Sequence, residues 1–539
     1  MSSLVSSLVA SPSSYVKAPL CAVAEKAATG LLKDIANGTL TIHTADRTYC
    51  FGEDSDVHGG VDSDADTLKT PKAELTVRNP VFWLRLCAMG DLGFAEAYMY
   101  GEIDCDDLAK VFLVFLANRA ELSTLDNSLF SRIMARMPQV GLGSYIVNTV
   151  ANARKNISAH YDISNNMFMG FLSKDMTYSC AIFPELDGDL HPPSSSSSSP
   201  TPSRTGASTP STLAGSDDAP KTIQFDALAL FPAPSAESEP PSGPDALEAA
   251  QFRKLRHILR KADIRPGHRI LEIGSGWGAL SILVTSTIPG TTVDTLTLST
   301  QQAALANARA QAAGVGDRVR VHLLDYRDMP REWEGAFDRV VSVEMVEAVG
   351  REYMETYWEK IDWALNKETG VGVVQGITIP EARFEQYMRE VDFIRKWVPP
   401  PYIFTLIDRA NRVPLAVFPG GFLPTLAFLI ETLNKGSHGR LVVDAVSNIG
   451  PHYARTLREW RRRFEARFED TIVPALKAEY PGVMDTDDAK AREEIEVFRR
   501  KWIYYYCYCE VGFTTRRLGD HIITFSREGN VEYGCQVYE

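Results

Sequence analysis

R-I-L-E-I-G-S-G-W-G-A-L, residues 269–280, predicts a buried strand that turns sharply into a helix. The strand is expected over Ile270–Ile273, and the turn carries three glycines, Gly274, Gly276 and Gly278. Glycines at this spacing let the backbone bend sharply and leave no Cβ between the chain and a ligand. Because the amides at the start of the next helix face whatever lies over the turn, this corner is expected to bind a ligand.

The residue that sets this corner apart from other glycine turns is Glu272, which completes an acid-x-Gly-x-Gly-x-Gly pattern. A glycine loop alone is weak evidence, since dinucleotide-binding folds use a similar one. No Gly-Lys-Ser or Gly-Lys-Thr follows, which argues against a nucleoside triphosphatase. The pattern resembles the first motif of class I S-adenosylmethionine methyltransferases, and an ordinary strand–turn–helix corner is the weaker alternative.

Strands and helices alternate on both sides of the glycine corner. Further strands are expected at 292–298, 319–324, 337–343 and 371–379, with helices at 247–262 and 300–313. This alternation predicts an α/β fold with a doubly wound, mostly parallel sheet, whose ligands bind at the carboxyl ends of the strands. Residues 512–517 and 521–527 are expected to form a last antiparallel pair. Together with the motif, the pattern predicts a class I methyltransferase fold.

The composition is that of a soluble protein with more than one domain. The chain has 539 residues, of which 45% are hydrophobic and 23% charged, and its formal net charge is -13. This acidic balance argues against a nucleic-acid partner, because phosphate backbones need a basic surface. The eight cysteines are scattered, as in a reducing compartment. The expected location is the cytoplasm, and a peripheral contact with a membrane stays open.

Five segments follow from composition and pattern. Residues 1–27 are Ser-rich and expected to be disordered, and 28–145 to form a small α+β accessory domain. Residues 146–191 are expected to belong to the active site of the catalytic domain. The tract 192–245 is rich in Ser and Pro and expected to be a disordered insertion, because it cannot bury enough apolar surface to fold. Residues 246–539 are expected to form the methyltransferase domain.

Several further segments carry distinctive patterns, and the resemblance to one family rests on them. They are H-Y-D-I-S-N-N-M-F at 160–168, M-T-Y-S-C-A-I-F at 176–183, T-L-S-T-Q-Q at 297–302, D-Y-R-D-M at 325–329, F-D-R-V-V-S-V-E-M-V-E-A-V-G at 337–350, G-I-T-I-P-E-A-R-F-E-Q-Y at 376–387, H-Y-A-R-T-L-R-E-W-R at 452–461 and W-I-Y-Y-Y-C-Y-C-E-V-G-F at 502–513. With L-E-I-G-S-G-W-G at 271–278, they resemble the cyclopropane-fatty-acid synthase family of methyltransferases. The E-A-V-G sequence is similar to that of the eukaryotic, plant-type branch.

The resemblance implies a reaction. In this family, S-adenosylmethionine methylates a cis double bond of a phospholipid acyl chain, the resulting carbocation loses a proton, and a cyclopropane ring closes. A bound bicarbonate is thought to take the proton. The implied cofactors are therefore S-adenosylmethionine and bicarbonate, and the implied partner is an unsaturated phospholipid at a membrane surface. A sulfonium donor needs no metal ion, so no metal site is expected. Whether the protein forms a homodimer stays open.

The resemblance also implies the catalytic residues. Glu347, at the end of the fourth strand, is expected to hold the bicarbonate, and Tyr505 with the backbones of Cys180 and Ile377 is expected to complete the site. Gln375 stands where bacterial members have His, and its amide can donate hydrogen bonds but cannot titrate. The alternative for Glu347 is a carboxylate that only stabilises the start of a helix through its dipole.

The donor site is expected along the carboxyl ends of the first three strands and the segment near residue 178. No acid ends the second strand, and the family is expected to use the backbone there. Tyr326 is a candidate to stack on the adenine, and a half-buried core aromatic is the equal alternative. The implied donor-binding residues are Tyr161, Tyr178, Ser179, Glu272, Gly274, Gly276, Gly278, Thr297, Leu298, Gln302, Asp325, Tyr326 and Arg327.

Three other functions stay open. An N-methyltransferase of small amines could share this fold, but such relatives are expected to keep a Glu-His pair where Ala348 follows Glu347. Lipid methylation without ring closure is the second alternative, and a non-catalytic lipid-binding protein is the third.

The arginines between 455 and 467 suit anionic headgroups or, equally, a face paired with Glu459, Glu465 and Glu469. Residues 398–417 look inserted relative to the family.

Overall fold

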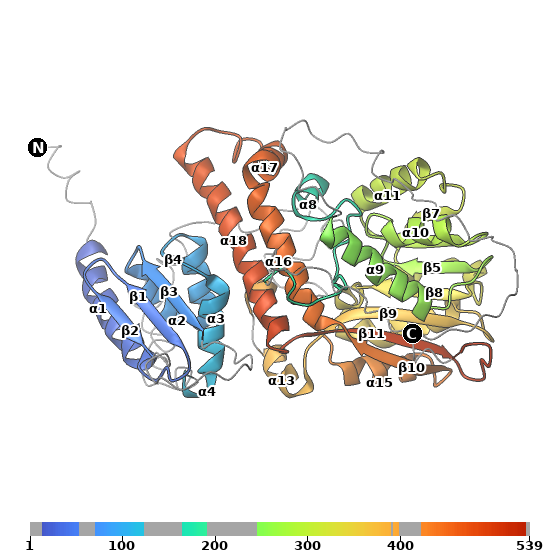
Figure 1. The fold of residues 1–539 in the computed structure, drawn as a ribbon, viewed down its shortest axis with the longest axis horizontal. Coiled ribbons are helices and arrows are strands. Elements are labelled where there is room, and N and C mark those ends of the chain that lie inside the picture. The colour runs from blue at the N-terminus through green and yellow to red at the C-terminus, as the bar shows by residue number, and fades with distance from the viewer. Residues whose placement is uncertain are drawn as a thin grey trace, which may run out of the picture.

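The computed structural model describes residues 13–52, 71–122, 164–190, 245–389, 392–397 and 422–534. The expectations for Tyr161, for residues 192–244 and for the apparent insertion at 398–417 lie outside the described residues. Figure 1 shows a small N-terminal domain and a larger sheet domain on opposite sides of two long helices, α16 and α18. Within the described residues, every helix is too short or too polar to span a bilayer.

The larger domain is built on a seven-stranded sheet with the order β10-β11-β9-β8-β5-β6-β7. Strands β7, β6, β5, β8 and β9 run parallel, whereas β11 runs antiparallel to β9 and β10. The bounds are β5 (Arg269–Ile273), β6 (Thr292–Thr297), β7 (Val319–Leu323), β8 (Arg339–Val343), β9 (Val371–Thr378), β10 (Leu441–Asn448) and β11 (Gly519–Arg527). The α/β methyltransferase fold is confirmed, and the order reverses at β5, which carries the glycine corner.

Helices cover both faces of this sheet, because successive residues of a strand point to opposite sides. Ile270 of β5 packs into one core with α9 (Ala246–Lys261) and α10 (Ala279–Thr287). Its neighbour Leu271 packs into a second core with α12 (Met354–Ala364) and α15 (Leu426–Gly436). A strand covered on both faces needs a continuous apolar run, and β5 supplies one apart from its buried acid, Glu272. The described part of the chain after residue 164 also contains the helices α8 (Asn165–Phe171), α11 (Thr300–Ala312), α13 (Glu381–Arg389), α14 (Phe393–Trp397) and α17 (Val473–Glu479).

The last antiparallel pair differs from the sequence prediction in one strand. The partner of β11 is β10, in which Val446 lies opposite Ile523, and the expected strand at 512–517 is wrong. Its first residues instead continue α18 (Ala489–Thr514). Phe513 stacks on Tyr453 of α16 (Gly450–Ala466) with ring centroids 4.4 Å apart. This packing carries the helix through Gly512 and Thr514, residues that favour strands or turns in isolation.

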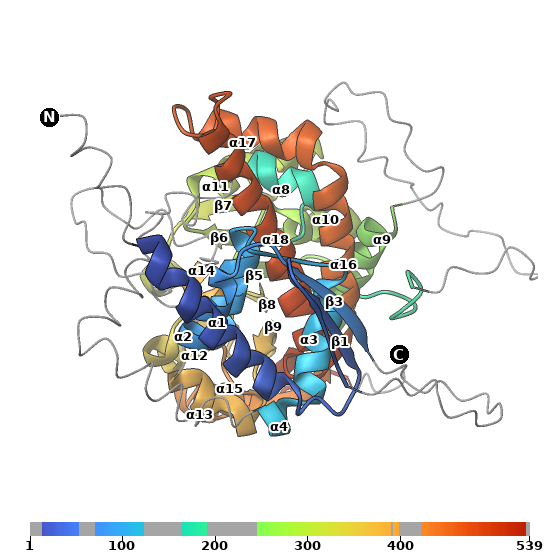
Figure 2. The same ribbon diagram turned by 90° about the vertical axis from the view of Figure 1, so that its left-hand side faces the viewer.

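The N-terminal domain contains a four-stranded sheet with the order β2-β1-β3-β4. The expectation that residues 1–27 are disordered is wrong from Ser13 onward, because α1 begins there and buries Cys21 and Ala24. Figure 2 shows α1 lying across α2, with which it makes close contacts. The elements are α1 (Ser13–Leu32), β1 (Thr39–His43), β2 (Thr48–Phe51), β3 (Lys72–Val77), α2 (Val81–Met99), β4 (Ile103–Cys105), α3 (Leu108–Ala117) and α4 (Arg119–Leu122).

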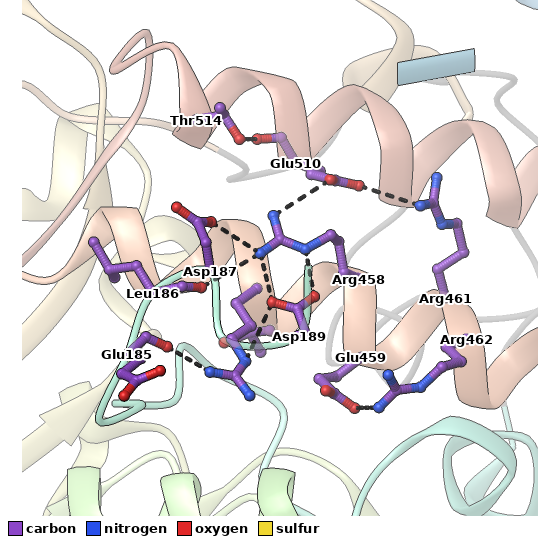
Figure 3. Close-up of polar contacts among 12 residues, drawn as sticks. Glu185, Leu186, Asp187, Asp189, Arg458, Glu459, Arg461, Arg462, Glu510 and Thr514 are labelled. Atoms are coloured by element: carbon purple, nitrogen blue, oxygen red, sulfur yellow. Dashed lines mark hydrogen bonds and ion pairs between the residues drawn. The ribbon is translucent and has the colours of Figure 1, made fainter. Parts of the chain in front are cut away.

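The arginines of α16 bind acidic groups of the chain itself. Figure 3 shows Arg458 between Asp189 and Glu510, with Nε–Oδ2 and Nη1–Oε1 distances of 2.7 and 3.5 Å. Arg461 also binds Glu510, and Arg462 binds Glu459. These contacts favour the hypothesis that the arginines pair with acidic residues of the chain over the hypothesis that they bind lipid headgroups. Most of the acidic partners lie outside α16. They also fix residues 185–189, and thereby the segment before them, to the long helices.

Replacing Arg458 by Leu is expected to lower the free energy of unfolding by about 3 kcal/mol, because two buried carboxylates would each lose their shorter ion pair. Asp189 would keep only Arg455 at 3.4 Å, and Glu510 only Arg461 at 3.7 Å. The side chains of Asp189 and Glu510 are only 6% and 10% exposed. Urea denaturation measures the change. The matched control, Arg389→Ala, removes a pair with Glu385 whose side chains are 79% exposed and should cost less than about 1 kcal/mol. Equal losses in the two variants would contradict the structural role of Arg458.

Candidate active site

The glycine corner has the backbone that its sequence requires. Gly274, Gly276 and Gly278 have φ angles of +99°, +48° and +85°, in the region that favours glycine. A Cβ on Gly276 would meet no atom within 4 Å, so this residue faces open space. Gly278 instead caps α10, which begins at Ala279, and a Cβ there would lie 3.2 Å from the Cβ of Ala306. Gly276 therefore leaves room for a ligand, and Gly278 leaves room for helix packing.

A cavity of about 570 Å³ opens over this corner. Most of the expected donor-binding residues line it. Among those that the structure describes, Gly278 is the exception. The residues from the prediction that line it are Tyr178, Ser179, Glu272, Gly274, Gly276, Thr297, Leu298, Gln302, Asp325, Tyr326 and Arg327. These residues come from three strand ends, those of β5, β6 and β7, and from one segment that precedes the sheet domain in sequence. The cavity fits a donor that combines an apolar ring with charged and hydroxyl groups.

Side chains at the ends of β6 and β7 fix the far wall of the cavity. The Thr297 hydroxyl donates to Gln302 Oε1 at 2.8 Å, so the two residues are held together. Asp325 accepts from the Arg327 backbone and binds its guanidinium at 2.6 Å. Tyr326 packs edge-on against Tyr357 with centroids 5.5 Å apart while its other side lines the cavity. Tyr326 is thus a partly buried aromatic of the core, as the second alternative has it, and its stacking on the adenine stays a prediction.

The segment before residue 190 forms the near wall of the cavity. Tyr178 stacks on Trp460 with centroids 4.9 Å apart, and its hydroxyl lies 3.0 Å from that of Tyr505. Ser179 accepts a hydrogen bond on its hydroxyl from Lys254 at 2.6 Å, and its carbonyl accepts from Gln251 at 2.7 Å. Lys254 and Gln251 are both completely buried on α9. These bonds attach the segment to the sheet domain.

Glu347 lies behind the cavity at the end of β8, where it was expected. Its Oε1 accepts from the backbone N–H of Ile377 at 2.5 Å, and its Oε2 is buried without a hydrogen-bond partner among the residues that the structure describes. A Cβ on Gly376 would lie 2.4 Å from Val346, so only glycine fits beside this carboxylate. Burial, and then the charge of Glu344, raise the pKa of Glu347 to about 8.

Sequence reasoning missed Glu344, the other acid of the E-M-V-E sequence. Its carboxylate accepts from the Cys180 N–H at 2.8 Å, from Gln375 Nε2 at 2.9 Å and from the Tyr453 hydroxyl at 2.6 Å. Unlike Glu347, it lines the cavity. The only signal for it was an acid directly after a buried strand. Cys180 and Gln375, expected around an external anion, thus bind this side chain.

Two further charged groups missed by sequence reasoning complete the site. Asp520 of β11 accepts from Gln375 Nε2 at 2.8 Å and is completely buried. Burial, and then the charge of Glu344, raise the pKa of Asp520 well above its usual value, which favours its protonated form. Lys254 is the buried cation that faces Glu344. Burial also raises the pKa of Glu272 to about 7, although its hydrogen bonds favour the ionised form and oppose this rise.

Known proteins resemble this chain over most of its length. The family model described as "Mycolic acid cyclopropane synthetase" matches residues 148–196 and 240–521. Tuberculostearic acid methyltransferase UfaA1 of Mycobacterium tuberculosis is 32% identical over 446 residues, which cover 83% of this chain and 81% of that protein. Cyclopropane-fatty-acyl-phospholipid synthase of Escherichia coli is 26% identical over 465 residues, covering 86% and 90%. A solved structure of mycolic acid cyclopropane synthase CmaA1, complexed with SAH and CTAB, is 22% identical and covers 69% of this chain and 97% of that chain, with a TM-score of 0.44.

Proposed function

Since the chain belongs to the mycolic acid cyclopropane synthetase family and is an S-adenosylmethionine-dependent lipid methyltransferase, we propose that it methylates the cis double bond of an unsaturated phospholipid acyl chain and closes a cyclopropane ring. The observation that carries this proposal is Oε2 of Glu347, a buried carboxylate oxygen that has no hydrogen-bond partner in the described part of the chain and lies next to the wall of the donor cavity. Methylation of an alkene leaves a cation, and ring closure requires a group that removes a proton from it.

The residues of the chain divide into those that bind the donor and those that protect the cation. Gly276 and the ends of β6 and β7 are positioned to bind S-adenosylmethionine, which supplies an electrophilic methyl group when bound. Tyr178 and Trp460, which are stacked, exclude water on the other side. Their electron-rich rings attract positive charge, and a dry site strengthens that attraction. Glu347 accepts the proton on Oε2.

The experiment that tests this proposal supplies the purified protein with methyl-labelled S-adenosylmethionine and vesicles of a mono-unsaturated phospholipid. Hydrolysed acyl chains are then separated by gas chromatography and identified by mass spectrometry. Label in a cyclopropane chain is the expected result. Vesicles of the matching saturated lipid are the control and should take up no label. Label in small amines with none in lipid would overturn the proposal in favour of an N-methyltransferase.

Methylation without ring closure is the second candidate, because a relative at 32% identity is named a tuberculostearic acid methyltransferase. Both reactions methylate the same double bond and both require the loss of a proton or its equivalent. In ring closure the new methyl group loses a proton and its C–H electron pair forms the bond to the cationic carbon; without ring closure a hydride first shifts to that carbon, and loss of a proton then leaves a methylene chain. The same chromatogram distinguishes them, since a methylene chain elutes apart from a cyclopropane chain.

Turnover is expected to rise with pH and to level off above about pH 8. Glu347 accepts a proton only in its ionised form, and the ionised fraction rises about tenfold per pH unit below a pKa of about 8. The charged and titratable groups around it are Glu344, Asp520 and Tyr357, of which Glu344 has the largest effect on it. The initial rate at saturating donor and lipid between pH 6 and 9 is the measurement. A rate that falls over this interval would exclude Glu347 as the proton acceptor.

A further inference from the structure

The groups expected to bind a dissolved bicarbonate are already bound by the chain itself. The Cys180 N–H donates to Glu344 Oε1 at 2.8 Å, and the Ile377 N–H donates to Glu347 Oε1 at 2.5 Å. The Tyr505 hydroxyl lies 3.0 Å from that of Tyr178. Bicarbonate therefore does not fit this site without displacing a protein carboxylate.

Glu344 has the hydrogen bonds that a small bound anion would have. Three donors from separate elements converge on its carboxylate, one from the segment at Cys180, one from Gln375 of β9 and one from Tyr453 of α16. The donor distances lie between 2.6 and 2.9 Å. Hydrogen bonds of this kind favour the ionised form of a carboxylate. Burial raises the pKa of Glu344, but the hydrogen bonds from Cys180 and Tyr453 and the charge of Lys254 oppose that rise, so Glu344 is the acid of this group that is best able to hold a negative charge.

The backbone at Glu344 is unusual in a way that fits this role. Its φ angle is +48°, in the left-handed region that non-glycine residues rarely adopt. Such conformations persist where the surrounding structure fixes them, and they are frequent at functional sites. Here the turn directs the side chain from the end of β8 to the wall of the donor cavity.

The charges around Glu344 leave no place for an external anion. Lys254 is completely buried, donates to Ser179 and is the cation close to Glu344, although burial lowers its pKa. Burial raises the pKa of Asp520 and so favours its protonated form, and Gln375 is neutral and donates to both acids. Once Glu347 is ionised to accept the proton, two carboxylates already face this one cation, and a dissolved anion would have no charge partner among these residues.

From these contacts we propose that Glu344 is a built-in anion that takes the place of bicarbonate, so that the reaction needs no dissolved base. The inference rests on the proposed function. The C–H bond of the methylated acyl chain breaks, its electron pair closes the ring, and the proton passes to Glu347 Oε2. Glu344 stays ionised throughout and offsets the positive charge of the chain. The step needs no other reactant.

The test compares the wild type with Glu344→Gly and Glu344→Gln in buffer depleted of carbon dioxide and in buffer with added bicarbonate. Wild-type turnover is expected to change less than about twofold between the buffers. Glu344→Gly, which suits a positive φ and leaves the three donors free, is expected to lose about 100-fold in turnover and to regain at least tenfold with bicarbonate. Glu344→Gln fills the same space and is expected to show no such recovery.

Binding of bicarbonate is measured separately from turnover. The ¹³C resonance of labelled bicarbonate is expected to broaden with Glu344→Gly and to stay sharp with the wild type and with Glu344→Gln. Cooperative thermal unfolding of the three proteins shows that each is folded. Wild-type turnover that requires bicarbonate, or wild-type binding of it at this site, would overturn the inference. If no lipid is methylated at all, the proposed function fails, while the resonance still decides whether Glu344 excludes the anion.

Discussion

Replacing Glu347 by Gln is expected to lower turnover by about 100-fold or more and to leave the affinity for S-adenosylhomocysteine unchanged. Gln keeps the size of the side chain and its hydrogen bond from the Ile377 N–H, which is 2.5 Å long in the native protein. It cannot accept a proton at the position of Oε2, and loss of a positioned base typically costs 10² to 10⁴-fold, of which we expect roughly the lower end. The carboxylate does not line the donor cavity, so donor binding is unaffected.

Two measurements make this expectation specific. Steady-state rates with vesicles give the turnover, and titration calorimetry gives the donor affinity. The matched control, Glu359→Gln, makes the same change on the exposed side of α12 and should behave as the wild type. Unaltered turnover in Glu347→Gln would show that the carboxylate only stabilises its own helical turn, the alternative that the sequence left open.

The parallel part of the fold could be predicted because its signals are local. β5 to β9 are short runs rich in apolar and β-branched residues that alternate with helices, and each predicted strand lies within a few residues of the observed one. β10 could not be found in this way. Its burial alternates along Leu441–Asn448, which is typical of an edge strand, and its partner β11 lies more than 70 residues later in the sequence. The C-terminal extension of α18 depends on Tyr453, a contact that no local pattern reveals.

The donor side of the site could be predicted for a similar reason. Its residues follow the ends of consecutive strands, and these ends meet at one edge of a parallel sheet. The carboxylate cluster depends instead on contacts between distant segments. Gln375 was expected to bind an external anion. In the structure its amide donates hydrogen bonds to both Glu344 and Asp520, which are 176 positions apart in the sequence. The left-handed turn that directs the Glu344 side chain toward the cavity could not be predicted from the sequence. Glycine is the residue that usually signals such a backbone conformation, and this position holds a glutamate.

Replacing Gly276 by Leu is expected to weaken donor binding by about 10 to 100-fold, which corresponds to the 1–3 kcal/mol that an overpacked site typically loses. The Cα of Gly276 faces open space in the cavity, so the new side chain would fill the volume that the donor needs. Titration calorimetry with S-adenosylhomocysteine measures the loss. Turnover at saturating donor should fall less than turnover at low donor concentration.

The control for this prediction separates blocked space from backbone strain. Gly267 also has a positive φ, +83°, and a Cβ there would likewise meet no atom within 4 Å, but it lies in an exposed turn outside the cavity. Gly267→Leu therefore carries a similar conformational cost, about 1–2 kcal/mol, without an effect on the donor. Equal donor affinities of the two variants would mean that the donor does not lie over the glycine corner, because only Gly276→Leu places atoms there.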